Sequence, residues 1–160
     1  MDWWDTSHYQ PLADWRPCPA YEENSDEYDL FVASSRLPLH NHSVSADNPW
    51  IDDVCAHSRL DYNILLNTET ARKKGIEDGD IVCIESRAGK VKGKVRVTEC
   101  VHPEVVGDLG GHLGQWAKHK TISRGKGIHH NALLNFDWNM VGTITGQLDT
   151  CAKVKIYKEK

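Results

Sequence analysis

Two histidines one residue apart, His40 and His42, are the first side chains whose types and spacing could bind a metal. A structural zinc site takes four ligands, and no further Cys, His or acidic residue falls near this pair at a metal-binding spacing. Asp78-Gly79-Asp80 begins like a calcium loop but lacks the other spaced carboxylates and the closing glutamate. We therefore expect no metal site formed by this chain.

Signatures of independent catalysis are absent from the sequence. It contains no Ser-His-Asp signature, no P-loop and no glycine fingerprint for dinucleotide binding. The cysteines are odd in number, widely spaced and never in a C-x-x-C pair, which predicts reduced thiols: they are Cys18, Cys55, Cys83, Cys100 and Cys151. We expect no catalytic residue in this chain taken alone.

The apolar pattern predicts a β-rich domain from residue 30 onward. Strands are expected over residues 30–33, 62–66, 81–86, 90–101 and 152–157, short helices within 50–60 and over 69–74, and loops over most of 107–146. Asn67 or Thr68 can cap the helix over 69–74, and Gly75 can end it. Many short strands joined by glycine-bearing turns favour a closed β-barrel.

Residues 1–29 differ from the rest of the chain. They combine prolines, three tryptophans and many acidic residues, and they show neither a helical nor a strand period. We interpret them as an extended arm. Because solvated linkers are normally poor in aromatic residues, we hypothesise that the arm docks on another polypeptide.

Charge and hydropathy limit the kinds of partner. Residues 32–160 hold 18 Lys plus Arg against 15 Asp plus Glu, a balance that suits a phosphate-bearing small ligand better than a nucleic acid. No apolar run approaches the roughly 20 residues of a membrane helix, and the acidic, aromatic N-terminus is unlike a secretory signal. We expect no direct membrane insertion, and a cytoplasmic location unless a partner's signal carries the chain elsewhere.

The most specific feature is the stretch 66–82, LNTETARKKGIEDGDIV. It resembles the C-terminal molybdopterin-dinucleotide-binding domain of the dimethyl sulfoxide reductase family of molybdenum and tungsten oxidoreductases. Three further stretches agree in order and spacing with that family: RLPLHNHS at 36–43 with NPW at 48–50, the turn at 107–112, and GIHHNAL at 127–133 with TGQ at 145–147.

The resemblance implies a mainly β fold, a double-psi β-barrel of the aspartate decarboxylase type over residues 30–160, with a few short helices and the arm over 1–29. It also implies that the chain completes a site for molybdopterin guanine dinucleotide. The metal, molybdenum or tungsten, would be held mainly by the cofactor and by a large catalytic partner, either a separate subunit or the remainder of the same enzyme.

The side chains and glycines that the resemblance assigns to the cofactor site are Arg36, His40, His42, Ser43, Asn67, Gly110, Gly111, His112, His130, Asn131 and Gln147. The loop over 36–43 and backbone N–H groups near the paired glycines offer donors to a diphosphate. The amide of Asn67 suits guanine, and those of Asn131 and Gln147 suit the edge of a pterin.

Each assignment has an alternative. Asn67 could serve only as a helix cap, and His129 and His130 could be solvated loop residues. The barrel could also stand alone, as a protein-interaction module or as a relative of the self-processing aspartate decarboxylases. Those decarboxylases need a Gly-Ser bond, and the sequence has none. The interaction module therefore remains the second interpretation.

Overall fold

The structure is a computed structural model that describes residues 9–12, 14–36, 38–40, 44–109, 121–142 and 145–159. Six strands form its centre: β1 (Leu30–Ser35), β2 (Ile64–Leu66), β3 (Ile81–Glu85), β4 (Lys90–Val97), β5 (Val105–Leu109) and β6 (Ala152–Lys158). The helices are short: α1 (Pro19–Glu22), α2 (Pro49–Ala56), α3 (Thr68–Lys74) and the 3-10 turns η1 (His130–Leu133) and η2 (Trp138–Met140).

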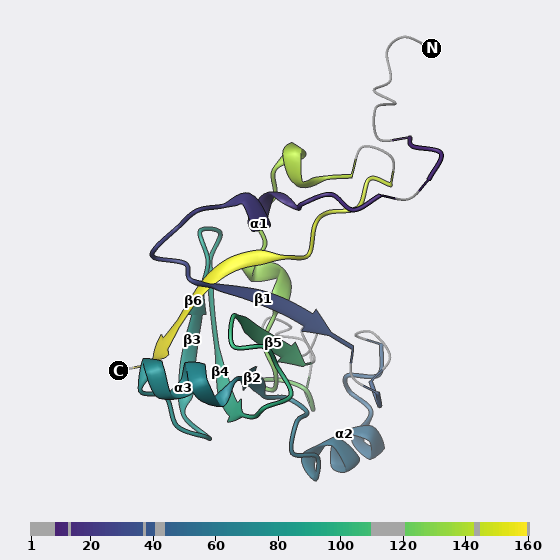
Figure 1. Ribbon diagram of the computed structural model, residues 1–160. Coiled ribbons are helices and arrows are strands. Elements are labelled where there is room, and N and C mark those ends of the chain that lie inside the picture. Colours follow the sequence, from purple (N-terminus) through teal and green to yellow (C-terminus); the bar gives the residue numbers. More distant parts are fainter. Residues whose placement is uncertain are drawn as a thin grey trace.

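The six strands close into a barrel in the order β1-β5-β2-β4-β3-β6 (Figure 1). Two neighbouring pairs are parallel, β1 with β5 and β2 with β4, and the other four are antiparallel. The closed barrel and its two parallel crossings agree with the double-psi β-barrel that the family resemblance implies. The predicted fold class is confirmed.

The core is aliphatic and receives side chains from all six strands. In β6, Ala152, Val154 and Ile156 are buried and alternate with the more exposed Lys153 and Lys155, as the period-2 pattern of that strand predicts. Ile128 and Leu133 lie outside the strands, but both are fully buried and belong to the same core cluster. The hydrophobic driving force is therefore spread over the strands and the 128–133 segment.

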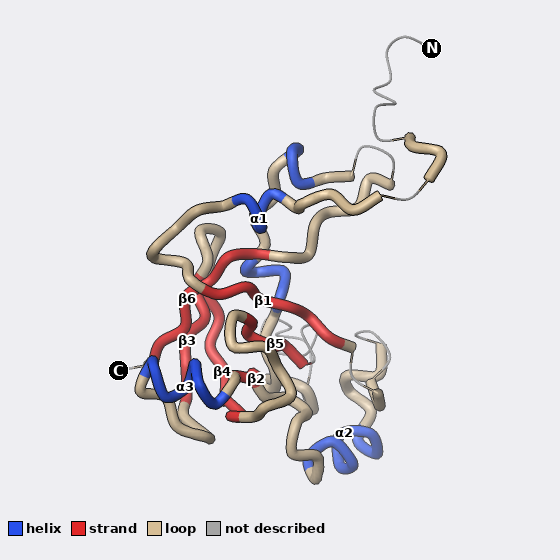
Figure 2. Tube along the Cα trace, in the orientation of Figure 1, coloured by secondary structure: helices blue, strands red, loops and turns tan. Residues whose placement is uncertain are grey.

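The local signals around α3 are confirmed. The side chain of Asn67 accepts a hydrogen bond from the N–H of Glu69, 2.8 Å away, and so caps the helix. Gly75 ends it with φ of 65°, a left-handed conformation that glycine adopts without steric cost. Figure 2 shows α3 and α2, both blue, at separate places around the red strands.

The sequence misjudged one strand and several boundaries. β5 lies in the region expected to be a turn and loops, because Gly107 was interpreted as a turn residue. Gly107 is buried instead, where an added Cβ would lie 3.1 Å from Cβ of Leu65 and 3.0 Å from Val101. β4 ends at Val97 rather than 101, and β2 begins at Ile64 because Tyr62 has a positive φ of 64°.

Residues 18–29 run along the barrel (Figure 1). Ala20 is buried, Glu27 pairs with Lys155 and Asp29 pairs with Lys74. Farther out, Trp15 is 72% exposed. The division of the chain at residue 29 stays a prediction. Across the described residues, no helix has the length and apolar character needed to cross a bilayer.

Candidate functional site

The parallel pairing of β1 with β5 defines one end of the barrel. Ser35, the last residue of β1, pairs with Leu109, the last residue of β5. Because carboxyl ends of parallel strands meet at one edge, the chain leaves both strands at the same place. Arg36, the first residue of the predicted stretch 36–43, therefore lies at the end of the barrel where β5 also ends.

The structure describes only some of these predicted residues. Arg36 directly follows β1 and is exposed. His42, Ser43, Gly110, Gly111 and His112 lie outside the described residues. Their assignment to the cofactor stays a prediction.

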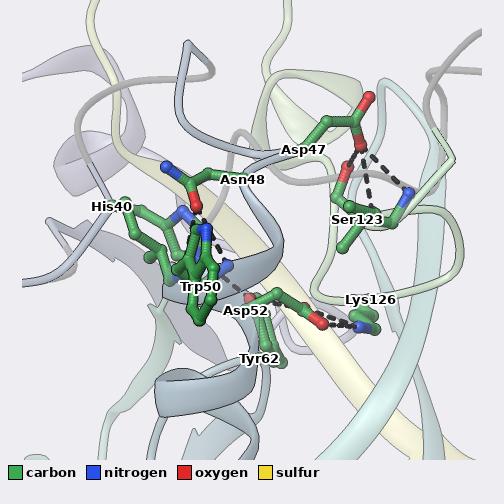
Figure 3. A network of polar contacts seen from close by, with 10 residues as sticks. His40, Asp47, Asn48, Trp50, Asp52, Tyr62, Ser123 and Lys126 are labelled. Atoms are coloured by element: carbon green, nitrogen blue, oxygen red, sulfur yellow. Dashed lines mark hydrogen bonds and ion pairs between the residues drawn. The ribbon is translucent and has the colours of Figure 1, made fainter.

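His40 is buried, makes two hydrogen bonds inside the protein and belongs to the polar network drawn in Figure 3. Its Nε2 lies 2.8 Å from the hydroxyl of Tyr62, and its Nδ1 lies 3.2 Å from Oγ of Ser45. The Tyr62 hydroxyl donates to Asp52, so it accepts from His40, which places the histidine proton on Nε2. Burial lowers the pKa of His40, which favours this neutral form.

Asp52 connects this histidine to a distant segment. Its Oδ1 accepts from Tyr62 at 3.0 Å, and its Oδ2 lies 2.7 Å from Nζ of Lys126. Burial, followed by the hydrogen bond to Asp52, raises the pKa of the Tyr62 hydroxyl. Tyr62 therefore stays a neutral donor, and the chain His40–Tyr62–Asp52–Lys126 links the loop after β1, α2 and the segment before η1.

The carboxylate of Asp47 binds backbone N–H groups of the same segment. Its Oδ1 accepts from the N–H groups of Ile122 at 3.1 Å and Ser123 at 3.2 Å, and from the hydroxyl of Ser123 at 3.3 Å. Ser123 is fully buried. Hydrogen bonds to a carboxylate are among the stronger ones in proteins. Asp47 and Asp52 together fix residues 121–126 against the loop that follows β1 (Figure 3).

Asn67 lies at the opposite end of the barrel. β2 is antiparallel to β5, and Leu66 pairs with Val106 near the start of β5. The amide of Asn67 donates to the carbonyl of Val101 at 2.8 Å and to Glu99 at 3.3 Å, in addition to capping α3. An open groove lined by residues 67–69, 72 and 99–103 lies beside it. Asn67 was expected to be either a helix cap or a guanine ligand. Its side chain caps α3, and its amide group already donates hydrogen bonds within the protein.

The three residues predicted near the end of the family pattern differ in their surroundings. His130 is buried in η1, where its Nε2 lies 2.9 Å from the carbonyl of Thr150, so it is not a solvated loop residue. Asn131 is exposed on the same turn, and Gln147 is exposed next to Gly146, which has φ of 64°. The described residues contain no group of three or more Cys, His, Asp or Glu arranged to hold a metal.

Comparison with known families decides the relationship. The family model described as "Molydopterin dinucleotide binding domain" matches residues 30–139. This chain belongs to that family. The match begins at the first residue of β1 and includes β1 to β5, so the molybdopterin-dinucleotide-binding domain carries most of the closed barrel and the loop ends described above.

Curated relatives of the molybdopterin-dinucleotide-binding domain are much longer proteins. The thiosulfate reductase molybdopterin-containing subunit PhsA of Salmonella typhimurium is 29% identical over 108 residues, which cover 68% of this chain and 14% of the relative. The dopamine dehydroxylase of Eggerthella lenta is 31% identical over 102 residues, 56% of this chain and 10% of the relative. The chain thus spans about a seventh or less of these relatives.

A solved structure supports the fold. Acetylene hydratase from Pelobacter acetylenicus superposes with a TM-score of 0.63 over 82% of this chain and 18% of its own, at 17% sequence identity. At that identity the likeness concerns the fold alone.

The polar network of the domain was not found by sequence reasoning. Asp47, Asp52, Tyr62 and Lys126 appear in no motif that was interpreted as functional. Lys126 lies 74 residues from Asp52, and no local pattern signals such a pair. The one hint was the position of Asp47 directly before the NPW stretch at 48–50.

Proposed function

We propose that this domain forms one wall of a molybdopterin guanine dinucleotide site whose metal, molybdenum or tungsten, and catalytic residues lie on a larger polypeptide. The observation that carries the proposal is the pairing of Ser35 with Leu109, because the strands that precede both predicted diphosphate stretches end at one edge of the barrel. When bound, the cofactor would supply the metal-centred oxidation–reduction chemistry. The domain would bind and orient it.

The donor set of the domain fits the cofactor in kind. The Arg36 guanidinium suits a phosphate, and the exposed amides of Asn131 and Gln147 suit a pterin edge, which presents both donors and acceptors. His40 is assigned a positioning role, since both of its ring nitrogens bond within the protein. Asn67 is assigned a structural role for the same reason.

The partner in this proposal is the catalytic portion of a molybdopterin oxidoreductase, in a separate subunit or in the rest of the same enzyme. Support comes from the length of the relatives and from exposed aromatic side chains. Trp15 and Tyr21 near α1 are 72% and 61% exposed, and Phe136 and Trp138 beside η2 are 70% and 80% exposed. Aromatic residues are enriched at protein interfaces, and α1 and η2 border one shared pocket. These exposed aromatic side chains support the hypothesis that the arm docks on the partner.

The test is to purify the tagged chain gently from its native host and to analyse the complex. We expect a large partner, molybdenum or tungsten by elemental mass spectrometry, and a guanine nucleotide released by acid hydrolysis. A metal-free chain with partners but no nucleotide would support the stand-alone interaction module instead.

Two variants test whether Arg36, at this end of the barrel, contributes to nucleotide binding. Arg36→Gln should lower the nucleotide-to-protein ratio of the purified complex by about tenfold, the effect of losing roughly one charge-assisted phosphate contact. Arg72→Gln is the matched control, because Arg72 is exposed on α3 and away from this end. Equal nucleotide content in both variants would remove Arg36 from the site.

A further inference from the structure

Residues 18–29 lie along the barrel (Figure 1) and are joined to the rest of the domain by ion pairs. Each pair joins an acidic side chain of this segment to a basic side chain from a different element: Glu23 to Arg87 between β3 and β4 at 2.5 Å, Glu27 to Lys155 of β6 at 2.6 Å, and Asp29 to Lys74 of α3 at 2.7 Å. The paired residues are 45 to 128 positions apart in the sequence, so the tertiary structure brings them together. The domain therefore presents a basic surface, formed by Lys74, Arg87 and Lys155, to one acidic segment.

Aromatic contacts of the same segment add to the ion pairs. The Arg87 guanidinium lies 5.9 Å from the centre of the Tyr28 ring, and the Lys155 ammonium lies 5.3 Å from it. Both cations are within the range of a cation–π interaction. Tyr21 stacks on Phe31 of β1, with 6.1 Å between ring centres and 19° between ring planes. The segment is thus bound to the domain by its acidic and its aromatic side chains together.

We propose that residues 18–29 form an electrostatic strap, a segment of this chain that occupies a basic interaction surface of its own domain and that another acidic polypeptide can displace. The segment bound in the structure shows which chemistry the basic surface recognises. Its carboxylates at positions 23, 27 and 29 lie on both sides of Tyr28 in the sequence. The partner that fits is therefore an acidic peptide segment that carries an aromatic residue.

The strap is bound weakly enough to be displaced. One side chain of each ion pair is substantially exposed: Arg87 at 63%, Glu27 at 61% and Asp29 at 45%. Exposed ion pairs contribute little individually and are screened by salt. Ala20 is the one buried residue within 18–29, so the strap can leave without opening the core. Lys155 also pairs with Glu85 at 3.3 Å, so it keeps a counter-charge when the strap leaves.

Displacement of the strap would uncover more than the basic side chains. Ala20 and Glu23 of the strap line a small pocket together with Arg87, Leu133 and Ala152 of the domain. With the strap gone, apolar surface of Leu133 and Ala152 would lie beside the Arg87 guanidinium. An apolar or aromatic side chain of an acidic partner would bury that surface, as Ala20 does in the closed arrangement.

The first experiment treats the full chain with chymotrypsin at about 0.1 M salt, where the screening length is roughly 10 Å, and follows cleavage after Tyr28 by mass spectrometry. Cleavage reports the population in which the strap has left the domain. Glu23→Lys and Arg87→Glu each place like charges together and should be cleaved about twofold to fivefold faster, the effect of losing one exposed ion pair. The double variant restores opposite charges and should return to the rate of the unaltered chain.

Glu22→Lys is the matched control, because it makes the same charge change at the neighbouring exposed residue. Its rate should stay within about twofold of the unaltered chain. Equal rates in Glu23→Lys and Glu22→Lys would overturn the strap. A double variant that is cleaved as fast as its single parents would also overturn it, because the cause would then be local unfolding and not the ion pair.

A second experiment tests the partner chemistry with poly-aspartate as the probe. Poly-aspartate should speed cleavage of the unaltered chain relative to sodium chloride at the same ionic strength, and it should have a smaller effect on Arg87→Glu. A short tyrosine-containing peptide, cleaved in the same mixtures, corrects for effects on the protease. Equal cleavage rates in poly-aspartate and sodium chloride would overturn the assignment of the basic surface to an acidic partner.

Discussion

Asp52 and Lys126 lie 74 residues apart in the sequence, and their side chains approach to 2.7 Å between Oδ2 and Nζ. The Asp52 side chain is only 17% exposed and also accepts from Tyr62. This pair ties α2 to the segment that leads into η1, and it is the central contact of the network in Figure 3. Removal of this ion pair should therefore loosen the packing of both segments.

Asp52→Asn should destabilise the domain by about 1–3 kcal/mol, because Lys126 loses its counter-charge in a partly buried position. Chemical denaturation measures the change. Asp53→Asn, next along α2 and exposed, is the matched control and should stay within about 0.5 kcal/mol of the unaltered chain. Equal stability of the two variants would show that the ion pair contributes nothing.

His40 should make stability depend on pH. Its pKa in the folded protein is lowered below the ordinary 6.5. In the pH interval between the folded-state pKa and the ordinary value, the unfolded chain therefore binds more protons than the folded protein does. Stability should rise as pH increases through the interval and fall as pH decreases below 6.5. Thermal unfolding from about pH 5 to about pH 8, the range in which histidines titrate, measures this slope. The slope should flatten in His40→Gln and persist in the exposed control His57→Gln. A steeper slope in His40→Gln would contradict the sign.

Gly93→Ala should destabilise the barrel by about 1–3 kcal/mol through overpacking. An added Cβ at Gly93 would lie 2.8 Å from Cγ2 of Ile128 and 3.0 Å from Cδ1 of Ile64, both fully buried side chains. Shortening the neighbour that is crowded through its terminal methyl, in Gly93→Ala with Ile64→Val, should return part of the loss, because valine lacks Cδ1. Additive losses in the double variant would point to a cause other than crowding.

Asn67→Ala should cost about 0.5–2 kcal/mol, since the variant loses the α3 cap and the bond to Val101. Asn48→Ala is a matched loss of a cap, because the side chain of Asn48 accepts from Trp50 and Ile51 at the start of α2. If Asn67 is structural, the assembled complex should retain guanine nucleotide equally in both variants. A selective loss of nucleotide in Asn67→Ala would restore Asn67 as a ligand.

Much of the local structure could be predicted from the sequence. The alternation in 152–157 indicated β6, and Asn67 with Gly75 marked both ends of α3, because burial period and cap chemistry are properties of neighbouring residues. The order of the motifs indicated the family. β5 was missed because a glycine that is required by close packing against Leu65 has the same local appearance as a glycine in a turn.

Tertiary structure alone decided which side chains work together. The predicted ligand His40 bonds Tyr62 and Ser45, and the residues predicted to share one cofactor site divide between two barrel ends, with Asn67 opposite Arg36. Neither result could be read from spacing. Strand pairing and ion pairs join residues tens of positions apart, and the free energy of such contacts depends on the closed barrel that brings them together.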